Sequence, residues 1–336
     1  MAQAHPEYKN ILVIHFGQLG DVVLGMPAFK AIRERFQDAH ITAIVGKVPD
    51  QVVRLSGLMD EVVMVDRVDL RDGPKLRSIA KIIALTRMVR SRKIDLVVDL
   101  HSLAETNILA FLSKAKHRLL ANRENRSLDR LSNFQPKPPL EDKTKHLSER
   151  YMDVLSPLGI DGPAGTFLLR GSAEDAAFVT TKLAETDRKT VGLFPGAGHP
   201  SRCWPLENFA ALAERLSAED IRPAVFLGPE EAGMRDKVAE IFPDETVIVD
   251  GLSIPQFIAA AARLDAFVTN DTGPMHLAAC AGAPIVLLLD EQAPITYLPL
   301  TDEISIIQSG NIAEITVDEA YAATLQRLRN DKSHGA

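Results

Sequence analysis

Cysteine is scarce in this chain of 336 residues, which contains only Cys203 and Cys280. Two cysteines so far apart form neither a disulfide framework nor the ligand spacing of a structural metal site, so we expect a reducing compartment. Long apolar runs are also missing. No stretch reaches the roughly 18 residues that a membrane-spanning helix needs, and MAQAHPEYKN at the N-terminus lacks the apolar segment of a signal peptide. These absences argue against a secreted or membrane-spanning protein and favour the cytoplasm.

Several motifs of common enzyme classes are absent as well. The chain has no GK[ST] motif of a P-loop, no HExxH, no CxxC and no GxSxG. This argues against a P-loop nucleotidase, a zinc protease, a redox dithiol protein and a serine hydrolase. No two aspartates are spaced as D-x-D. If a diphosphate leaves from this protein, we therefore expect arginine and helix dipoles to meet its charge in place of a dedicated metal ion.

Charge is distributed unevenly along the chain. The net charge of −7 argues against a general nucleic-acid-binding protein. Residues 1–165 nevertheless carry 25 Lys and Arg against 20 Asp and Glu, whereas residues 166–336 carry 13 against 25. An anionic partner is therefore expected on the first half, where 114–130 (KAKHRLLANRENRSLDR) is the densest basic segment, although a solvated helix face gives the same pattern.

Short apolar runs alternate with helical patterns in both halves, which is typical of parallel sheets covered on both faces. Ligands of such sheets gather at the carboxyl ends of the strands. The sequence predicts an α/β fold with two Rossmann-like, doubly wound domains facing each other across a cleft, over 1–163 and 164–316, followed by a C-terminal helix over 317–336. Strands are expected at 10–15, 41–46, 61–66, 94–100, 190–194, 223–227, 246–249, 266–269 and 285–289.

The stretch TNDTGPMH (269–276) lies where a strand pattern passes into a helix. A glycine for the turn and a proline for the first helical turn predict a helix whose free N–H groups, those of Thr272, Gly273 and Met275, form a phosphate seat. Asp271 would repel phosphate, so we expect it to accept hydrogen bonds from hydroxyls of an attached sugar. Ordinary helix capping by Asp271 or Thr272 is the alternative.

A second strand-to-helix junction is GLFPGAGHPSRCWPLENF (192–209). Gly196 and Gly198 allow close approach of the backbone to a ligand, and Arg202 offers a planar group suited to phosphate. Trp204, the only tryptophan, is expected to be a packing anchor. The glycine pair by itself does not make a dinucleotide-binding fingerprint.

The third junction is ILVIHFGQLGDVVLG (11–25). Gly17 and Gly20 flank a tight loop after the first strand, and Asp21 opens the next helix. An aspartate there also has an ordinary explanation, because it stabilises a helix N-terminus by about 0.3–1 kcal/mol. We expect Asp21 at the lip of the first sheet, across the cleft from the phosphate seat, where its carboxylate can take a proton from an attacking hydroxyl.

Four segments together resemble a known family: FGQLGDVVLGMPAF, FPGAGHPSRCWPLENFAALA, VFLGPEE and TNDTGPMHLAACAGAPIVLL. They are similar to glycosyltransferase family 9, the heptosyltransferases that transfer a heptose from ADP-heptose to the inner core of lipopolysaccharide. The resemblance spans nearly the whole chain, and its D-[ST]-G-x-x-H motif is specific. It implies a GT-B fold, a C-terminal helix free to return to the first domain, and inverting, metal-independent transfer at the cytoplasmic face of the inner membrane.

Site residues follow from the resemblance by their positions in these motifs. Asp21 resembles the catalytic base, and Arg202 stands where the family usually has a lysine that meets the diphosphate. His15 stands where the family commonly has an arginine. Either Glu230 or Glu231 is in register with the carboxylate that binds ribose, and His276 is either a packing histidine or a ligand contact. The implied donor and phosphate residues are Ala197, Gly198, Arg202, Glu231, Leu252, Asp271, Thr272, Gly273 and His276.

The expected partners are a nucleotide-sugar donor, a lipid-linked anionic glycan as acceptor and the inner-membrane surface, with no nucleic acid and no cofactor. Arg118, Arg123 and Arg126 of the basic segment are the candidate acceptor-binding residues. The sequence does not identify the acceptor sugar or its linkage position. Two other functions fit the pattern: a sugar-nucleotide epimerase of similar fold, and a non-catalytic module that binds a nucleotide sugar or glycolipid.

Overall fold

The computed structural model describes residues 7–124 and 128–330. The chain divides into two compact units between Gly165 and Thr166, two residues after the division that the sequence predicts. Charge follows the same division, because the half with an excess of Lys and Arg, residues 1–165, is the first unit.

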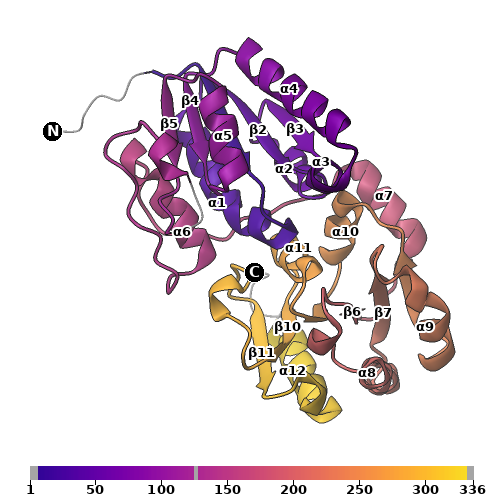
Figure 1. Cartoon of the computed structure of the whole chain (residues 1–336). Coiled ribbons are helices and arrows are strands. Elements are labelled where there is room, and N and C mark those ends of the chain that lie inside the picture. Colours follow the sequence, from indigo (N-terminus) through magenta and orange to yellow (C-terminus); the bar gives the residue numbers. More distant parts are fainter. Residues whose placement is uncertain (1–6, 125–127, 331–336) are drawn as a thin grey trace. The chain divides into compact units, whose positions relative to one another are not determined.

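The first unit is built on a parallel five-stranded sheet in the order β3-β2-β1-β4-β5 (Figure 1). The order reverses at β1, so β1 lies in the middle and its carboxyl end is the switch point where ligands of doubly wound sheets bind. The strands are β1 Asn10–His15, β2 His40–Gly46, β3 Glu61–Val65, β4 Leu96–Asp99 and β5 His117–Leu120.

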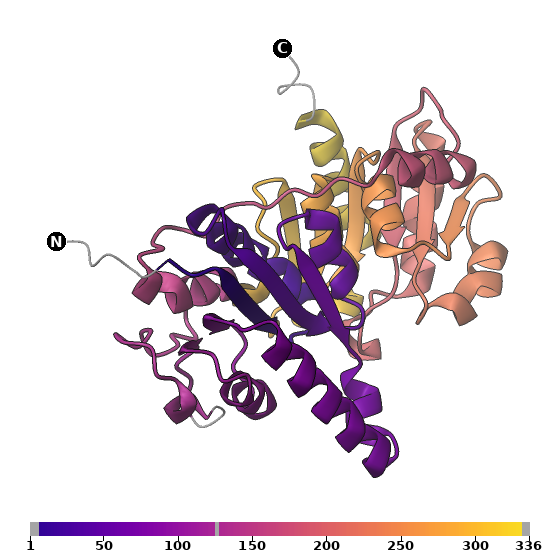
Figure 2. The same cartoon turned by 90° about the horizontal axis from the view of Figure 1, so that it is seen from above.

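Helices cover both faces of this sheet, and in Figure 2 the strands lie between the dark indigo α1 and the purple α4. On one face, Leu12 and Ile14 of β1 pack with Val89 of α4 and Leu109 of α5. On the other face α1 packs against α6. Because neighbouring side chains of a strand point to opposite faces, His15 belongs with α1 and α6. The helices are α1 Leu19–Arg35, α2 Asp50–Ser56, α3 Arg67–Asp72, α4 Lys75–Ser91, α5 Ala104–Leu112 and α6 Leu147–Leu155.

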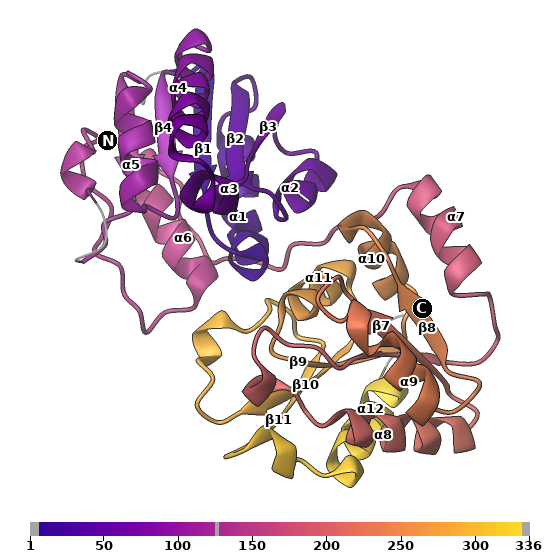
Figure 3. The same cartoon turned by 45° about the vertical axis from the view of Figure 1, so that its right-hand side comes forward.

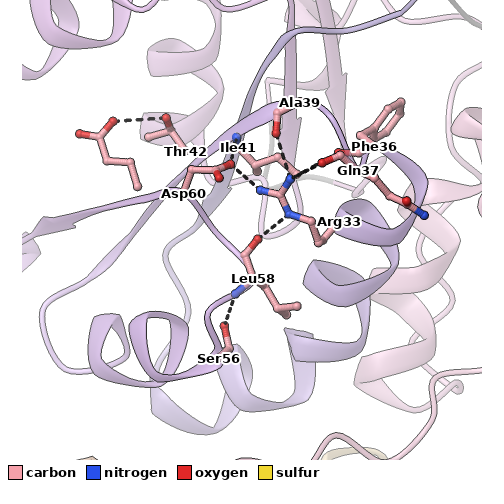
Figure 4. Close-up of polar contacts among 10 residues, drawn as sticks. Arg33, Phe36, Gln37, Ala39, Ile41, Thr42, Ser56, Leu58 and Asp60 are labelled. Carbon is pink, nitrogen blue, oxygen red and sulfur yellow. Dashed lines mark hydrogen bonds and ion pairs between the residues drawn. The ribbon is translucent and has the colours of Figure 1, made fainter.

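Arg33, near the end of α1, joins two loops of the first unit (Figure 4). Its guanidinium donates hydrogen bonds to the carbonyl oxygens of Ala39 at 2.9 Å and Leu58 at 2.8 Å, and it also binds the Asp60 carboxylate. Asp60 in turn accepts a hydrogen bond from the Ile41 N–H at 2.7 Å. One arginine therefore satisfies backbone carbonyls of both loops and aligns β2 with the segment that leads into β3.

The second unit contains a parallel six-stranded sheet in the order β11-β10-β9-β6-β7-β8. Here the order reverses at β6, whose neighbours are β9 and β7. The carboxyl ends of these three strands therefore form the switch point of this unit. The strands are β6 Thr190–Phe194, β7 Arg222–Leu227, β8 Val247–Asp250, β9 Ala266–Asn270, β10 Ile285–Asp290 and β11 Ile304–Ser309.

Two layers of helices enclose the second sheet, as Figure 3 shows for α10 and α11 on one side and α8 and α12 on the other. The main core joins apolar side chains of β6, β7, β9 and β10 to α8, α9 and α12. On the opposite face Phe226, Phe257 and Phe267 meet edge to face. The helices are α7 Ala173–Lys182, α8 Leu206–Ala218, α9 Arg235–Ile241, α10 Ile254–Ala261, α11 Gly273–Ala281 and α12 Val317–Asn330.

The predicted fold class, an α/β protein with two doubly wound parallel-sheet domains, is confirmed. Helix α12 packs on α8, β9 and β10, with Ala320 and Leu328 buried in the core of the second unit. The return of the C-terminal helix to the first domain stays a prediction. Two strands, β5 and β11, were not predicted from the sequence. Within the described ranges, none of the helices is long and apolar enough to cross a membrane.

Candidate functional site

The loop between β6 and α8 is held to the end of β9 by one buried amide. Asn270, the last residue of β9, donates from Nδ2 to the carbonyl oxygens of Pro195 at 3.0 Å and Gly196 at 3.2 Å. Its Oδ1 accepts a hydrogen bond from the Trp204 N–H at 3.0 Å. Both ends of the loop are therefore fixed to the strand that carries Asp271. Sequence analysis gave Asn270 no role, although an amide at the end of an apolar strand was a usable signal.

Trp204 is the packing anchor that the sequence predicts. The indole is buried, lies edge to face with Phe209, and donates from Nε1 to the Ile315 carbonyl at 2.8 Å. A buried tryptophan with its N–H satisfied leaves little freedom to the loop that precedes α8.

A pocket of about 450 Å³ opens beside this loop. It lies at the carboxyl ends of β6 and β7, which is where doubly wound sheets bind ligands. The volume falls within the range of small-molecule sites. Its lining residues are 195–197, 200 and 203–205 from the loop, Leu206 at the start of α8, and Glu230, Glu231 and Met234.

Glu231 is the buried carboxylate of this pocket, whereas Glu230 is exposed. The Oε2 atom of Glu231 accepts a hydrogen bond from the Gly228 N–H at 3.1 Å. Burial raises the pKa of Glu231, and the charge of Glu230 raises it further, against the lowering effect of the Gly228 N–H. Gly196 lies directly against this carboxylate: a Cβ on Gly196 would be 2.1 Å from Glu231 Oε1. A larger residue at position 196 would therefore force the Glu231 side chain to move.

Asp271 and Arg202 meet at the carboxyl end of β9. The Nη1 atom of Arg202 lies 3.6 Å from Oδ2 of Asp271. Burial raises the pKa of Asp271, and the charge of Arg202 opposes this rise. The two residues that the sequence assigns to phosphate and to sugar are thus brought together although they are far apart along the chain.

The N-terminus of α11 follows immediately. Thr272 is the residue before the helix, which begins at Gly273. The prediction that the Met275 N–H points freely out of the helix is wrong, because this group donates to the Thr272 carbonyl at 3.2 Å. The N–H groups of Thr272 and Gly273 remain as the candidate donors at this helix end.

The other candidates of the second unit lie in different surroundings. Ala197 lines the pocket, and Gly198 is exposed beside it. His276 is buried one turn into α11. Leu252 follows β8, a strand that β7 separates from β6, and does not line the pocket. The structure therefore groups most of these residues at the ends of β6, β7 and β9 and leaves Leu252 apart.

In the first unit, Asp21 lies in the first turn of α1 just after β1. One carboxylate oxygen accepts a hydrogen bond from the Gln18 N–H at 2.9 Å, so Asp21 does cap the helix. Gly17 packs against Asp21, because a Cβ there would lie 2.5 Å from the Asp21 Cβ. Burial raises the pKa of Asp21, and the Gln18 N–H, Arg123 and Arg150 lower it. The Gln18 N–H binds one carboxylate oxygen of Asp21 and leaves the other for a proton. A carboxylate of this kind with a raised pKa has the properties of a general base.

The two arginines whose charges act on Asp21, Arg123 and Arg150, share one carboxylate, Glu141. Glu141 lies 3.2 Å from Nη2 of Arg123 and 3.3 Å from Nη1 of Arg150, which belongs to α6. All three side chains are largely buried. Arg123 was predicted as an acceptor residue, whereas sequence reasoning missed Arg150 and Glu141.

Three rings lie together at the carboxyl end of β1. His15 is fully buried, with its ring centroid 5.2 Å from that of His101 and 4.8 Å from that of Tyr151. Burial, then the charges of Arg123 and Arg67, lower the pKa of His101 to about 3. Burial lowers the pKa of His15 well below its ordinary value too. Where the resemblance gives arginine, this chain therefore has a neutral imidazole.

The remaining acceptor candidates differ from Arg123. The Arg118 guanidinium donates to the carbonyls of Leu131 at 3.0 Å and Ala115 at 2.9 Å and lies over the Phe111 ring. It therefore holds the segment around Leu131 in place. Arg126 lies outside the described residues. Among the residues that the structure does describe, no three His, Cys, Asp or Glu side chains are grouped to hold a metal ion.

Comparisons with known proteins bear on the family of this chain. Residues 82–323 match the model of glycosyltransferase family 9 (heptosyltransferase). Lipooligosaccharide heptosyltransferase 2 of Haemophilus influenzae is 23% identical over 313 residues, which cover 89% of this chain and 88% of that protein.

Solved structures show the same fold. The glycosyl transferase family 9 protein of Veillonella parvula superposes with a TM-score of 0.86 at 24% identity, covering 97% of this chain and 99% of that one. The heptosyltransferase WaaC of Escherichia coli, solved with ADP, superposes with a TM-score of 0.78 at 18% identity, covering 95% and 99% of the two chains. The family match spans well over half of the sequence, and the chain therefore belongs to glycosyltransferase family 9, the heptosyltransferases.

Proposed function

We propose that this glycosyltransferase transfers a heptose from ADP-heptose to the inner core of lipopolysaccharide, with inversion and without a metal ion. The observation that carries the proposal is the grouping in the second unit of a buried carboxylate, an arginine–aspartate pair and a helix N-terminus at neighbouring strand ends. The relative from H. influenzae acts, by its name, on lipooligosaccharide, and the E. coli structure contains ADP, which supports this donor and this acceptor class.

The donor site is proposed to use two parts of this grouping. Glu231, in the pocket, accepts hydrogen bonds from the ribose hydroxyls. Its carboxylate is buried, and the neighbouring Gly196 has no side chain that would block the approach of a ligand. Arg202 and the N–H groups of Thr272 and Gly273 bind the diphosphate. Arg202 then exchanges its ion pair with Asp271 for the diphosphate, and Asp271 is released to bind hydroxyls of the sugar.

The proposed reaction is a single displacement. The acceptor hydroxyl gives its proton to Asp21 while its oxygen attacks the anomeric carbon of the heptose from the side opposite the diphosphate. The bond from this carbon to the diphosphate oxygen breaks, and ADP leaves with both electrons of that bond. Arg202 and the α11 N-terminus stabilise the charge that develops on ADP. Inversion follows from the single displacement.

For the acceptor we propose Arg123 above Arg118. Both guanidiniums have partners, Glu141 for Arg123 and backbone carbonyls for Arg118, but only the charge of Arg123 acts on the proposed base Asp21. Arg123 therefore lies near this base. A guanidinium there suits an acceptor that carries phosphate or carboxylate groups.

Incubation of the protein with a panel of nucleotide sugars and truncated lipopolysaccharide cores, read by mass spectrometry, tests the proposal. We expect a mass increase of one heptose on a core, with ADP-heptose only and with added chelator. Consumption of the donor without any acceptor would indicate an epimerase instead. Tight donor binding without product on any core would indicate a non-catalytic module.

A further inference from the structure

Helix α4 carries apolar side chains on its outer face. Leu76, Ile79 and Ile83 follow the spacing i, i+3, i+7, which places them on one side of a helix. Their exposed fractions are 85%, 53% and 45%, and the neighbouring Ile82 is exposed as well. A single exposed leucine is ordinary, but several large apolar side chains on one helix mark an interaction surface. We call Leu76, Ile79, Ile82 and Ile83 the α4 apolar face.

The inner side of α4 already has its own packing. Val89 is buried in the core of the first unit, and Leu85 and Met88 pack against it. Ser78 is buried as well. Figure 2 shows α4, in purple, along the outside of the first sheet. The α4 apolar face is therefore additional to the side chains that hold the helix on the sheet.

The charged side chains of α4 itself have one sign. Between Lys75 and Ser91, α4 has five basic residues and no acidic one. Lys75, Arg77 and Arg87 are exposed around the apolar face, whereas Lys81 pairs with Asp69 and Arg90 donates to the Leu112 carbonyl. The acidic residues nearest in sequence are Asp69 and Asp72 of α3.

A helix with an apolar face between exposed basic side chains has the composition of one that lies in a membrane interface, with its apolar face among the acyl chains. The same charges argue against a second copy of the chain as the occupant, because two such faces would bring like charges together. α5 adds to the same side of the sheet, since Ile108 and Phe111 are exposed and α5 contacts α4.

We infer that the α4 apolar face, with Lys75, Arg77 and Arg87, docks the protein on an anionic phospholipid surface. This inference deepens the proposed function, and rests on it, in naming the surface through which the enzyme reaches a membrane-borne acceptor. The chemistry it requires is simple: apolar side chains enter the acyl region, and the basic side chains bind lipid phosphates.

Co-sedimentation of the full chain with vesicles tests the inference. We expect binding to vesicles that contain phosphatidylglycerol and little binding to pure phosphatidylcholine. The double variant Lys75→Gln/Arg77→Gln should weaken binding by roughly fivefold for each charge removed. The control Lys143→Gln/Lys182→Gln removes the same charge from exposed sites outside α4 and should bind normally.

The apolar contribution has a test of its own. Leu76→Ser/Ile79→Ser should lower binding at least tenfold, by the loss of buried methylene groups, and Ile295→Ser, an exposed apolar site of the second unit, should not. Equal binding of the α4 variants and their controls would overturn the inference.

The vesicle-binding assay uses no sugar donor, so its outcome is independent of heptose transfer. A protein that binds vesicles through α4 but transfers no heptose would refute the proposed function alone, and one that transfers heptose to a soluble core but ignores vesicles would refute the docking surface alone.

Discussion

Asp21 has two duties that one substitution separates. As a helix cap it accepts a hydrogen bond from the Gln18 N–H, and as the proposed base it takes a proton. Asn keeps an oxygen for the cap and cannot accept the proton. We expect Asp21→Asn to lower kcat by about 10²–10⁴-fold, the usual contribution of a positioned base, with ADP affinity unchanged by calorimetry. Normal turnover in a folded variant would leave only the capping role.

Arg123 is expected to set the pH dependence of the reaction through Asp21. A base must be deprotonated to act, so activity falls as the pH drops through the pKa of Asp21. The charge of Arg123 lowers that pKa. Arg123→Gln should therefore raise the pKa of Asp21 and move the acid limb of the kcat/KM profile to higher pH. Arg123→Lys keeps the positive charge and should return the acid limb to the pH of the unchanged protein. If Arg123 acts only on the acceptor, its loss should raise the acceptor KM and leave the limb in place.

Gly196 and Gly198 give a matched pair of substitutions two residues apart. A Cβ on Gly196 would collide with the Glu231 carboxylate, whereas a Cβ on Gly198 would meet nothing within 4 Å. Gly196→Ala should lower the free energy of unfolding by about 1–3 kcal/mol, as overpacking does, and weaken ADP binding. Gly198→Ala should leave stability unchanged. Equal melting temperatures for both variants would show that the close contact with Glu231 carries no strain.

Between elements, an ion pair joins β3 to the segment that follows α4. Arg92 binds the Glu61 carboxylate through Nε at 2.6 Å and also through Nη2, and this hydrogen bonding lowers the pKa of Glu61. A lowered pKa means that the pair stabilises the fold above the ordinary glutamate pKa of about 4.3. This stabilisation is lost as the pH falls through the lower value in the folded protein.

We therefore expect Glu61→Gln to cost about 0.2–1 kcal/mol near neutral pH, because the pair is partly exposed. The cost should diminish as the pH drops below about 4. Urea unfolding at several pH values measures this difference. Glu185→Gln, at an exposed site in a loop, is the control and should show no such dependence. A cost that stays constant with pH would mean that packing, and not charge, links these segments.

The sequence predicted central elements better than edge elements. β1, β6 and β9 are buried on both faces, so their sequences are continuous apolar runs that leave little ambiguity. β5 and β11 each pair on one side only. The first is four residues long and lies within the basic segment, and the second is half-exposed. The edge strands β3 and β8 were nevertheless predicted. Edge position therefore weakens the sequence signal only where the strand also lies in a basic segment, as β5 does, or is half-exposed, as β11 is.

The same limit applies to the candidate site. Glycine, proline and aspartate at strand-to-helix junctions predicted Asp21, Asp271 and the loop after β6, because turn chemistry is local. The approach of Arg150 and Glu141 to Arg123 joins segments that no local pattern relates. The hydrogen bond from the Arg118 guanidinium to the Leu131 carbonyl could not be predicted either, because it depends on the path of the chain around Leu131.

In the molecule as a whole, the charges and the proposed functional roles are both divided between the two units, whose boundary lies between Gly165 and Thr166. The first unit carries the excess of Lys and Arg, the proposed base and the α4 apolar face. The second carries the excess of acidic residues and every residue proposed to bind the donor. An anionic diphosphate bound to an acidic unit depends on local groups, here Arg202 and a helix N-terminus, because the net charge of that unit opposes it.

The division predicts that residues 166–336 suffice for donor binding. This unit has its own closed core, to which α12 contributes, and all of the strand ends that form the pocket. Produced alone, it should fold and bind ADP with an affinity within about tenfold of that of the full chain, a difference in binding free energy of about 1.4 kcal/mol. It should transfer no heptose, because it lacks Asp21. Calorimetry with circular dichroism measures both properties, and Glu231→Gln should weaken ADP binding equally in the isolated unit and in the full chain. A folded unit that fails to bind ADP would show that the first unit supplies donor contacts, and the assignment of the donor to Glu231, Arg202 and α11 would then be incomplete.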